Sequence, residues 1–194
     1  MLRLGILISG EGTTYAAIAA AAGDGRIAAR IARVISSRAD AGGVARALSL
    51  GHPVTVVDPK DPAHHRAVAD VLAADGVDLV IMAGWLHLWK IPPEWVGRTI
   101  NTHPALIPAF SGRGFYGRRV HEAVMASGAR ISGCTVHAVD GEYDHGPILE
   151  QRAVPVEWSD SPESLAAKVQ AIEKSLLIHV IQQWPVYRER AARR

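Results

Sequence analysis

Two patterns of apolar residues alternate along the chain. Nearly continuous apolar runs, which are typical of strands buried on both faces, together with a short β-prone run and an alternating one, predict strands over residues 2–8, 31–36, 53–57, 77–82, 98–100, 132–139 and 148–156. Between these runs, apolar positions at helical spacing predict helices over residues 15–22, 41–50, 62–74 and 118–127. A last helix starts at Ser161, with a proline at its first position.

This alternation predicts the fold class. Strands that alternate with helices favour a single α/β domain over residues 1–194, Rossmann-like, with a mostly parallel sheet flanked by helices. The strand over residues 148–156 alternates between apolar and polar positions. We therefore expect it at the outside of the sheet, where it can pair antiparallel.

Composition excludes several classes of partner. The 194 residues are 48% hydrophobic and 21% charged with a net charge of +2, so charge gives no reason to bind nucleic acid or an anionic membrane. No apolar run is long enough for a signal peptide or a membrane span. Cys134 is the single cysteine, which fits a reducing compartment. We expect a cytoplasmic monomer or homodimer that binds small molecules, and a solvated helix end at the basic residues 188–194.

The turn after the first strand has the pattern of an anion-binding loop. Gly10 and Gly12 permit close approach of the backbone, and the next helix, with Thr13 or Thr14 as its N-cap, points free amides at the loop. A third glycine and a P-loop lysine are both missing, so neither a nicotinamide cofactor nor ATP is favoured. Glu11 disfavours an anion here unless its side chain points outward. The alternative is a plain connection between strand and helix.

The segment around Asn101 and His103 has the features of a catalytic edge. It follows the strand over residues 98–100 and ends at Pro104 and Pro108, which forbid further strand pairing. Residues two apart on an extended chain point to the same side, so both side chains are expected to face one cavity. An amide donor and an imidazole that titrates near neutral pH can hold a developing oxyanion. The alternative is a turn cap and a satisfied loop histidine; in both cases we expect His103 at a polar strand end and not in the core.

Three further features have simpler interpretations. Trp85 and Trp89 belong to an aromatic-rich loop and are either core residues beneath it or the wall of a flat heteroaromatic ligand. His64 and His65 point in different directions on a helix, so they are a poor metal pair and are interpreted as surface residues, with His64 at the rim of a site. The glycine-rich loop at residues 111–117 is expected to be mobile.

The motifs, in their order along the chain, resemble those of the folate-dependent formyltransferases over essentially the whole length. They are Ile-Ser-Gly-x-Gly at residues 8–12, Ala-Gly-Trp at 83–85, Asn-x-His-Pro-x-Leu-x-Pro at 101–108, Gly-Cys-Thr-Val-His at 133–137, Asp-x-x-x-Asp-x-Gly-Pro-Ile at 140–148, Gln151, and Val-Pro-Val at 154–156. Each motif is weak alone, but the ordered set is specific. The resemblance implies formyl transfer from the co-substrate 10-formyltetrahydrofolate to the amine of phosphoribosylglycinamide in purine biosynthesis, with no metal.

The resemblance also implies roles for individual residues. Asn101 and His103 would stabilise the oxyanion, and Asp144 would favour the imidazolium and relay protons. The implied substrate-binding residues are Gly12, Thr13, Thr14, Gln170 and Glu173, with the phosphate at the first helix N-terminus. The implied folate-binding residues are Leu86, His87, Leu88, Trp89, Asp140 and Gly141. No nucleophile is required, so Cys134 is expected to be a buried strand residue, and His137 to orient the site or hydrogen-bond in the core.

Several alternatives stay open. A formyltetrahydrofolate deformylase and a sugar-amine formyltransferase share the chemistry, but deformylases carry an extra N-terminal regulatory domain and Met1 leads here directly into the first expected strand. Methionyl-tRNA formyltransferases add a C-terminal RNA-binding barrel, which we do not expect in this chain. Two alternatives lie outside the family. One is a non-enzymatic nucleotide-binding module using the glycine turn, and the other is a metal hydrolase with His103, His137 and Asp144 as ligands.

Overall fold

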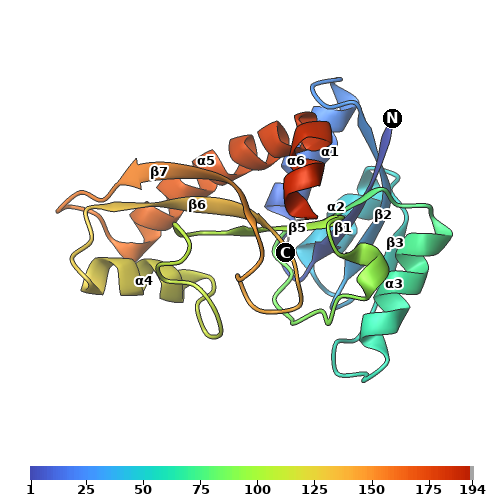
Figure 1. The fold of residues 1–194 in the computed structure, drawn as a ribbon, viewed down its shortest axis with the longest axis horizontal. Coiled ribbons are helices and arrows are strands. Elements are labelled where there is room, and N and C mark those ends of the chain that lie inside the picture. The colour runs from blue at the N-terminus through green and yellow to red at the C-terminus, as the bar shows by residue number, and fades with distance from the viewer. Residues whose placement is uncertain (193–194) are drawn as a thin grey trace.

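The computed structural model describes residues 1–192 and contains one seven-stranded sheet with helices packed against it (Figure 1). The strand order is β3-β2-β1-β4-β5-β6-β7. The strands are β1 (Leu2–Ile8), β2 (Ala29–Ser36), β3 (Val54–Val56), β4 (Leu79–Met82), β5 (Thr99–His103), β6 (Ile131–Ala138) and β7 (Ile148–Pro155). The helices are α1 (Thr13–Gly23), α2 (Gly42–Ser49), α3 (His64–Ala74), a short 3-10 helix η1 (Pro93–Trp95), α4 (Arg118–Ala126), α5 (Pro162–Gln182) and α6 (Trp184–Ala191). The predicted α/β fold is confirmed.

Strand direction divides the sheet into two parts. The five strands β3, β2, β1, β4 and β5 are mutually parallel, whereas β6 runs antiparallel to β5, and β7 antiparallel to β6. The prediction of an outer strand that pairs antiparallel is confirmed by β7. The carboxyl ends of β1, β4 and β5 lie along one edge of the sheet, and in such folds ligands bind at this edge.

Both faces of the parallel part are covered, which explains its continuous apolar sequence. Leu4 and Ile6 of β1 belong to an apolar cluster with residues of α1, α4, α5 and α6. Leu7 of the same strand belongs to a second cluster with residues of α3 and with Trp85 and Trp89. The two tryptophans are 6% and 1% exposed, so both are core residues beneath the loop, and both also line a cavity at the carboxyl edge of the sheet.

The start of α1 differs from the prediction. Neither threonine caps the helix; Gly12 is the N-cap, and no side chain hydrogen-bonds there. Gly12 has a φ of 67°, a left-handed conformation that favours glycine. A Cβ atom at this position would also lie 2.8 Å from the Cα of Gly43 in α2. The N-cap prediction was wrong because close packing between the loop and α2 requires glycine where a side-chain cap was expected.

The interpretation of His64 as a surface residue was also wrong. The residue is only 7% exposed, because the loop after β4 covers the start of α3.

Toward the C-terminus, Ser161 caps α5 through a reciprocal pair of hydrogen bonds with Ser164, as its position predicted. Residues 188–191 continue into α6, while residues 193–194 of the basic run lie outside the described residues. None of the helices within residues 1–192 is long and apolar enough to cross a membrane.

Candidate active site

A cavity of about 820 Å³ opens at the carboxyl edge of the parallel strands. The ends of β4 and β5, the start of α1, the loop after β6 and the inner side of α5 contribute to its lining. The predicted site residues that line it are Thr14, Leu86, His87, Leu88, Trp89, Asn101, His103, Asp144, Gln170 and Glu173. Gly12, Thr13, Asp140 and Gly141 are not part of the lining as described. The volume is within the range of cavities that bind organic ligands.

Asn101 faces the cavity from the antiparallel junction of the sheet. It is paired in register with His137 of β6, and its Nδ2 lies 3.1 Å from His137 Nε2. His137 Nδ1 lies 2.9 Å from the carbonyl oxygen of Ala138, which can only accept, so this nitrogen carries a hydrogen. In the neutral ring, Nε2 then accepts one N–H of Asn101 and leaves the second N–H free for a ligand. His137 thereby orients the Asn101 amide from a buried position.

His103 ends β5 and is held by two acceptors. Its Nε2 donates to the carbonyl oxygen of Phe110 at 2.8 Å, and its Nδ1 lies 3.3 Å from Asp144 Oδ2. Burial lowers the pKa of His103, and the Asp144 carboxylate and Phe110 carbonyl oppose that shift by favouring the charged ring. His103 lies at the polar end of β5, as expected, and belongs to neither apolar cluster, but the residue is only 3% exposed. The loop after Pro108 folds back over the end of the strand and covers the ring.

Asp144 comes from the connection between β6 and β7. Its backbone has a φ of 53°, a conformation that aspartate tolerates better than most residues. Its Oδ2 accepts the Gly112 amide at 2.9 Å, and its Oδ1 lies 3.6 Å from His137 Nε2. Burial raises the pKa of this carboxyl, but nearby His137, the charge of His103 and the hydrogen bond from the Gly112 amide outweigh burial and lower it. Asp144 is therefore an ionised carboxylate placed between two imidazoles.

A second carboxylate lies at the opposite side of the cavity, on α5. Glu173 Oε1 accepts hydrogen bonds from the hydroxyl groups of Thr14, at 3.3 Å, and Thr102, at 3.2 Å. These two bonds link α5 to the start of α1 and to β5. Burial raises the pKa of Glu173, and the two hydroxyl groups partly oppose that rise. Gln170 lines the cavity one helical turn before it.

Glu11 points away from the cavity. Its carboxylate packs directly against the α-carbon of Gly42, in the first turn of α2, and the residue is exposed. This orientation removes the conflict between its charge and an anion at the start of α1, because α2 presents its own positive helix end to the carboxylate. The first-turn amides of α1, including those of Thr13 and Thr14, receive no side-chain cap.

A buried network fixes the turn after β5. The hydroxyl group of Thr135 donates to the Ala105 carbonyl at 2.7 Å and accepts the Ile107 amide at 3.1 Å. Gln151 of β7 donates to the Ile107 carbonyl at 3.0 Å and to the Thr135 hydroxyl at 2.9 Å. Both residues lie in motifs noted in the sequence, and the contacts show what they do: they hold the proline turn against β6 and β7.

His121 is a cavity residue that sequence reasoning missed. It lies on α4, is 3% exposed and lines the cavity, and its Nδ1 has no hydrogen-bond partner among the described residues. Burial, together with the charge of nearby His103, lowers its pKa. A lone histidine on a predicted helix has no sequence signal that separates it from a surface residue.

Comparison with known proteins identifies the family. The sequence matches the formyl transferase family over residues 2–181. The chain belongs to the formyl transferase family. It is 42% identical over 188 residues to a chloroplastic phosphoribosylglycinamide formyltransferase of Arabidopsis thaliana, an alignment covering 92% of this chain and 64% of that protein. The chain thus spans somewhat less than two thirds of this plant relative.

Two bacterial relatives are closer in length. A phosphoribosylglycinamide formyltransferase of Haemophilus influenzae is 34% identical over 94% of this chain and 86% of its own. The crystal structure of glycinamide ribonucleotide transformylase 1 from Symbiobacterium toebii superposes with a TM-score of 0.86 at 39% identity, covering 94% of this chain and 86% of that one. The formyl transferase fold therefore extends over nearly all of the chain.

The polar residues of this formyl transferase cavity do not form a metal-binding group. Within residues 1–192, no three His, Cys, Asp or Glu side chains are arranged to hold a metal ion. His103, His137 and Asp144, the ligand set of the hydrolase alternative, instead make the pairwise contacts described above. Cys134 is buried in β6, which confirms the expected buried strand residue, and burial raises the pKa of its thiol to about 12.

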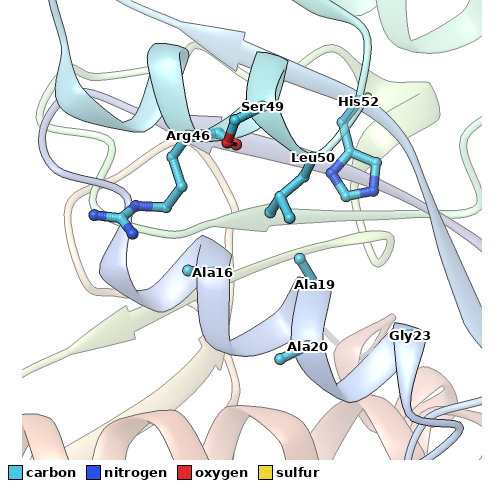
Figure 2. Close-up of a pocket in the computed structure, with 8 residues that line it drawn as sticks. All are labelled: Ala16, Ala19, Ala20, Gly23, Arg46, Ser49, Leu50 and His52. Atoms are coloured by element: carbon cyan, nitrogen blue, oxygen red, sulfur yellow. Dashed lines mark hydrogen bonds between the residues drawn. The ribbon is translucent and has the colours of Figure 1, made fainter.

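A second hollow, of about 600 Å³, lies between α1 and α2 (Figure 2). It is lined by Ala16, Ala19, Ala20, Gly23, Arg46, Ser49, Leu50 and His52, none of which is a predicted site residue. Arg46 reaches toward the start of α1, where its Nε donates to the Glu11 carbonyl at 3.3 Å. The residues of this hollow offer no counterpart of the Asn101, His103 and Asp144 group. The larger cavity is therefore the candidate site for the chemistry of the formyl transferase family.

Proposed function

We propose that this chain transfers the formyl group of 10-formyltetrahydrofolate to the amine of phosphoribosylglycinamide, a step of purine biosynthesis. The observation that carries the proposal is the end of β5, which presents Asn101 and His103 to one cavity together with Asp144. Family membership and the names of the relatives support the choice of substrates. A cytoplasmic location is part of the same proposal.

The cavity lining suits a folate on one side. Met82, Trp85, Leu86, Leu88 and Val139 give it an apolar wall, against which a flat ring system can bury its surface. When bound, 10-formyltetrahydrofolate supplies the carbonyl carbon that the amine attacks. The polar end of the same wall contains Asn101, so the formyl group would be placed near the amide.

Asn101 and His103 are the donors for the formyl oxygen. As the amine attacks, negative charge develops on this oxygen, and a free N–H of Asn101 together with a protonated His103 would stabilise it. Both ring nitrogens of His103 already face acceptors, Phe110 and Asp144. Donation to the formyl oxygen therefore requires that His103 exchange one of these two contacts for the substrate.

Asp144 has two tasks in this proposal. Its negative charge favours the protonated form of His103 against the effect of burial. Its carboxylate is also the base in the cavity that can accept a proton from the attacking amine and pass it toward the folate nitrogen, directly or through water. Because no bond to the protein forms, the reaction needs no nucleophilic side chain.

The opposite side of the cavity suits the amine substrate. Glu173 and Gln170 provide acceptor and donor groups for its polar atoms, and the uncapped amides at the start of α1 provide the anion site for its phosphate. Gly12 and Thr13 act there through their backbones, and Asp140 and Gly141 shape the folate side through the loop that carries Asp144.

The test is formyl transfer by the purified chain from 10-formyltetrahydrofolate, with three acceptors in parallel. These are phosphoribosylglycinamide, an amino sugar phosphate and no amine at all. We expect turnover with phosphoribosylglycinamide and little with the other two. Turnover that needs no amine would identify a deformylase, and preference for the amino sugar would replace the proposed acceptor.

A further inference from the structure

The loop at residues 85–90, between β4 and η1, presents five consecutive side chains to the cavity, from Trp85 to Trp89. It has no regular secondary structure, so its backbone groups need partners from elsewhere. The Leu86 amide donates to the Ser9 hydroxyl at 3.1 Å. Further partners come from the first turn of α3, which lies outside the cavity lining, where two consecutive histidines, His64 and His65, face the second half of the loop.

Three contacts join this turn to the loop. The backbone amide of Lys90 donates to His65 Nδ1 at 3.1 Å, and the indole Nε1 of Trp89 donates to the carbonyl oxygen of His65 at 2.9 Å. His64 Nε2 lies 3.4 Å from the carbonyl oxygen of Leu88. His64 Nδ1 also donates to the Asp61 carbonyl at 2.7 Å, which fixes the His64 ring to the start of its own helix.

The contact between His65 and Lys90 depends on one tautomer. A backbone amide can only donate, so His65 Nδ1 must be the acceptor and the ring hydrogen must be on Nε2. Burial lowers the pKa of His65, and the charges of His64 and Lys90 lower it further, so the ring is kept in the neutral form that this hydrogen bond needs. His65 is half-buried and stacks on His64, with 3.7 Å between the ring centroids.

We infer that His65, with His64 beside it, is a positioning residue that fixes the 85–90 loop and thereby sets affinity for the folate. The inference rests on the proposed function, because it takes this loop as the folate wall. His65 acts only through the loop, since neither its ring nor that of His64 is part of the cavity lining. A substitution of His65 should therefore weaken binding of the folate and leave the reacting groups on β5 unchanged.

A pair of substitutions separates the acceptor nitrogen from the rest of the ring. In His65→Asn, the amide oxygen can take the place of Nδ1 as the acceptor for the Lys90 amide. In His65→Phe, a ring of similar size remains but has no acceptor. Neither change touches the His65 carbonyl that binds Trp89. Arg66→Gln is the matched control, because Arg66 is the next residue of the same turn and binds Asp70 and Glu94 rather than the loop.

For His65→Phe we expect the KM for 10-formyltetrahydrofolate to rise about three- to tenfold, the range of one lost hydrogen bond. kcat and the KM for the amine should stay within about twofold of the parent values. His65→Asn and Arg66→Gln should show the parent folate KM. An unchanged folate KM in His65→Phe, an equal loss in the Asn and Phe variants, or an equal rise for both substrates would each overturn the inference.

Hydrogen exchange gives a readout that does not depend on turnover. The Lys90 amide should exchange faster in His65→Phe than in the parent, and at the parent rate in His65→Asn. If the parent chain transfers no formyl group, the proposed function fails on its own. The exchange rates then still decide whether His65 holds the loop, and equal rates in all variants would show that it does not.

Discussion

The parallel strands β1 and β4 and the antiparallel pair formed by β5 and β6 bury different kinds of side chain. In β1 and β4 the fully buried positions are apolar: Leu4, Ile6, Leu7, Ile8, Leu79, Val80 and Ile81. In β5 and β6 the buried positions include the polar side chains of Thr99, His103, Ser132, Thr135 and His137. Burying polar groups costs free energy unless they are hydrogen-bonded, so the β5–β6 pair accepts a cost that β1 and β4 avoid.

The difference shows how the fold divides its tasks. Strands of the parallel part contribute to the cavity through the segments after their carboxyl ends, such as the 85–90 loop and the start of α1. The antiparallel β5–β6 pair contributes residues of the strands themselves, since Asn101 and His137 are ladder partners whose positions are fixed by backbone pairing. Substitutions in the β5–β6 pair should therefore mainly lower activity, whereas substitutions in β1 and β4 should mainly lower stability.

The largest effect is expected for His103→Asn, in the antiparallel β5–β6 pair. It removes the imidazole donor while keeping a polar side chain at the end of β5, so kcat should fall by about 10²–10³. Because His103 is buried and bonded to Phe110, a modest loss of stability should accompany this. Steady-state kinetics and thermal unfolding measure the two effects. Near-parent turnover by folded protein would remove His103 from the mechanism.

The next effect is a shift of the pH profile in Asp144→Asn. In the parent, burial lowers the pKa of His103 and the Asp144 charge raises it. Without that charge the Phe110 carbonyl alone opposes the lowering effect of burial, so the protonated fraction of His103 at a given pH falls. kcat should drop by about tenfold or more, and its alkaline limb should move to lower pH. A parent-like profile of kcat against pH would contradict the role of Asp144 as the partner of His103.

A smaller effect, on stability and not on activity, is expected for Ile6→Val in β1. Ile6 is fully buried in the parallel part, and removing one methylene should cost about 1 kcal/mol of unfolding free energy. The melting temperature should fall by about 2–4 °C, with kcat and both KM values unchanged. A change in kcat without loss of stability would mean that the two parts are not separate in function.

The sequence predicted the strands of both parts of the sheet: residues 132–139 and 148–156 were expected, and β6 and β7 span Ile131–Ala138 and Ile148–Pro155. Continuous apolar runs define strands without reference to their neighbours, and the bounds of β1, Leu2–Ile8, were predicted without error. The burial of His64 could not be predicted, because the Leu88 carbonyl that faces it lies 24 residues away in sequence. The break between α5 and α6 at Gln183 also has only a weak local signal, the proline at position 185.

The candidate site divides in the same way. Two-residue spacing on a strand predicted that Asn101 and His103 face one cavity, and the lining confirms it. The proximity of Asp144 came only from the family resemblance, since a turn more than 40 residues further on is placed by the pairing of β5, β6 and β7. His121 and the Phe110 carbonyl were missed, because their contacts depend on how the 108–117 loop folds back over β5.

The smallest effect is expected for Glu11→Gln, at the loop after β1. The Glu11 carboxylate packs against Gly42 in the first turn of α2 and points away from the cavity, so it should interact with the end of that helix and not with a substrate phosphate. Removing the charge should lower the unfolding free energy by about 0.3–1 kcal/mol. The KM for the amine should not change, even at low salt, where a charge facing the phosphate would be least screened. Kinetics at two ionic strengths and chemical unfolding test this, and an amine KM that falls at low salt would place the carboxylate beside the phosphate after all.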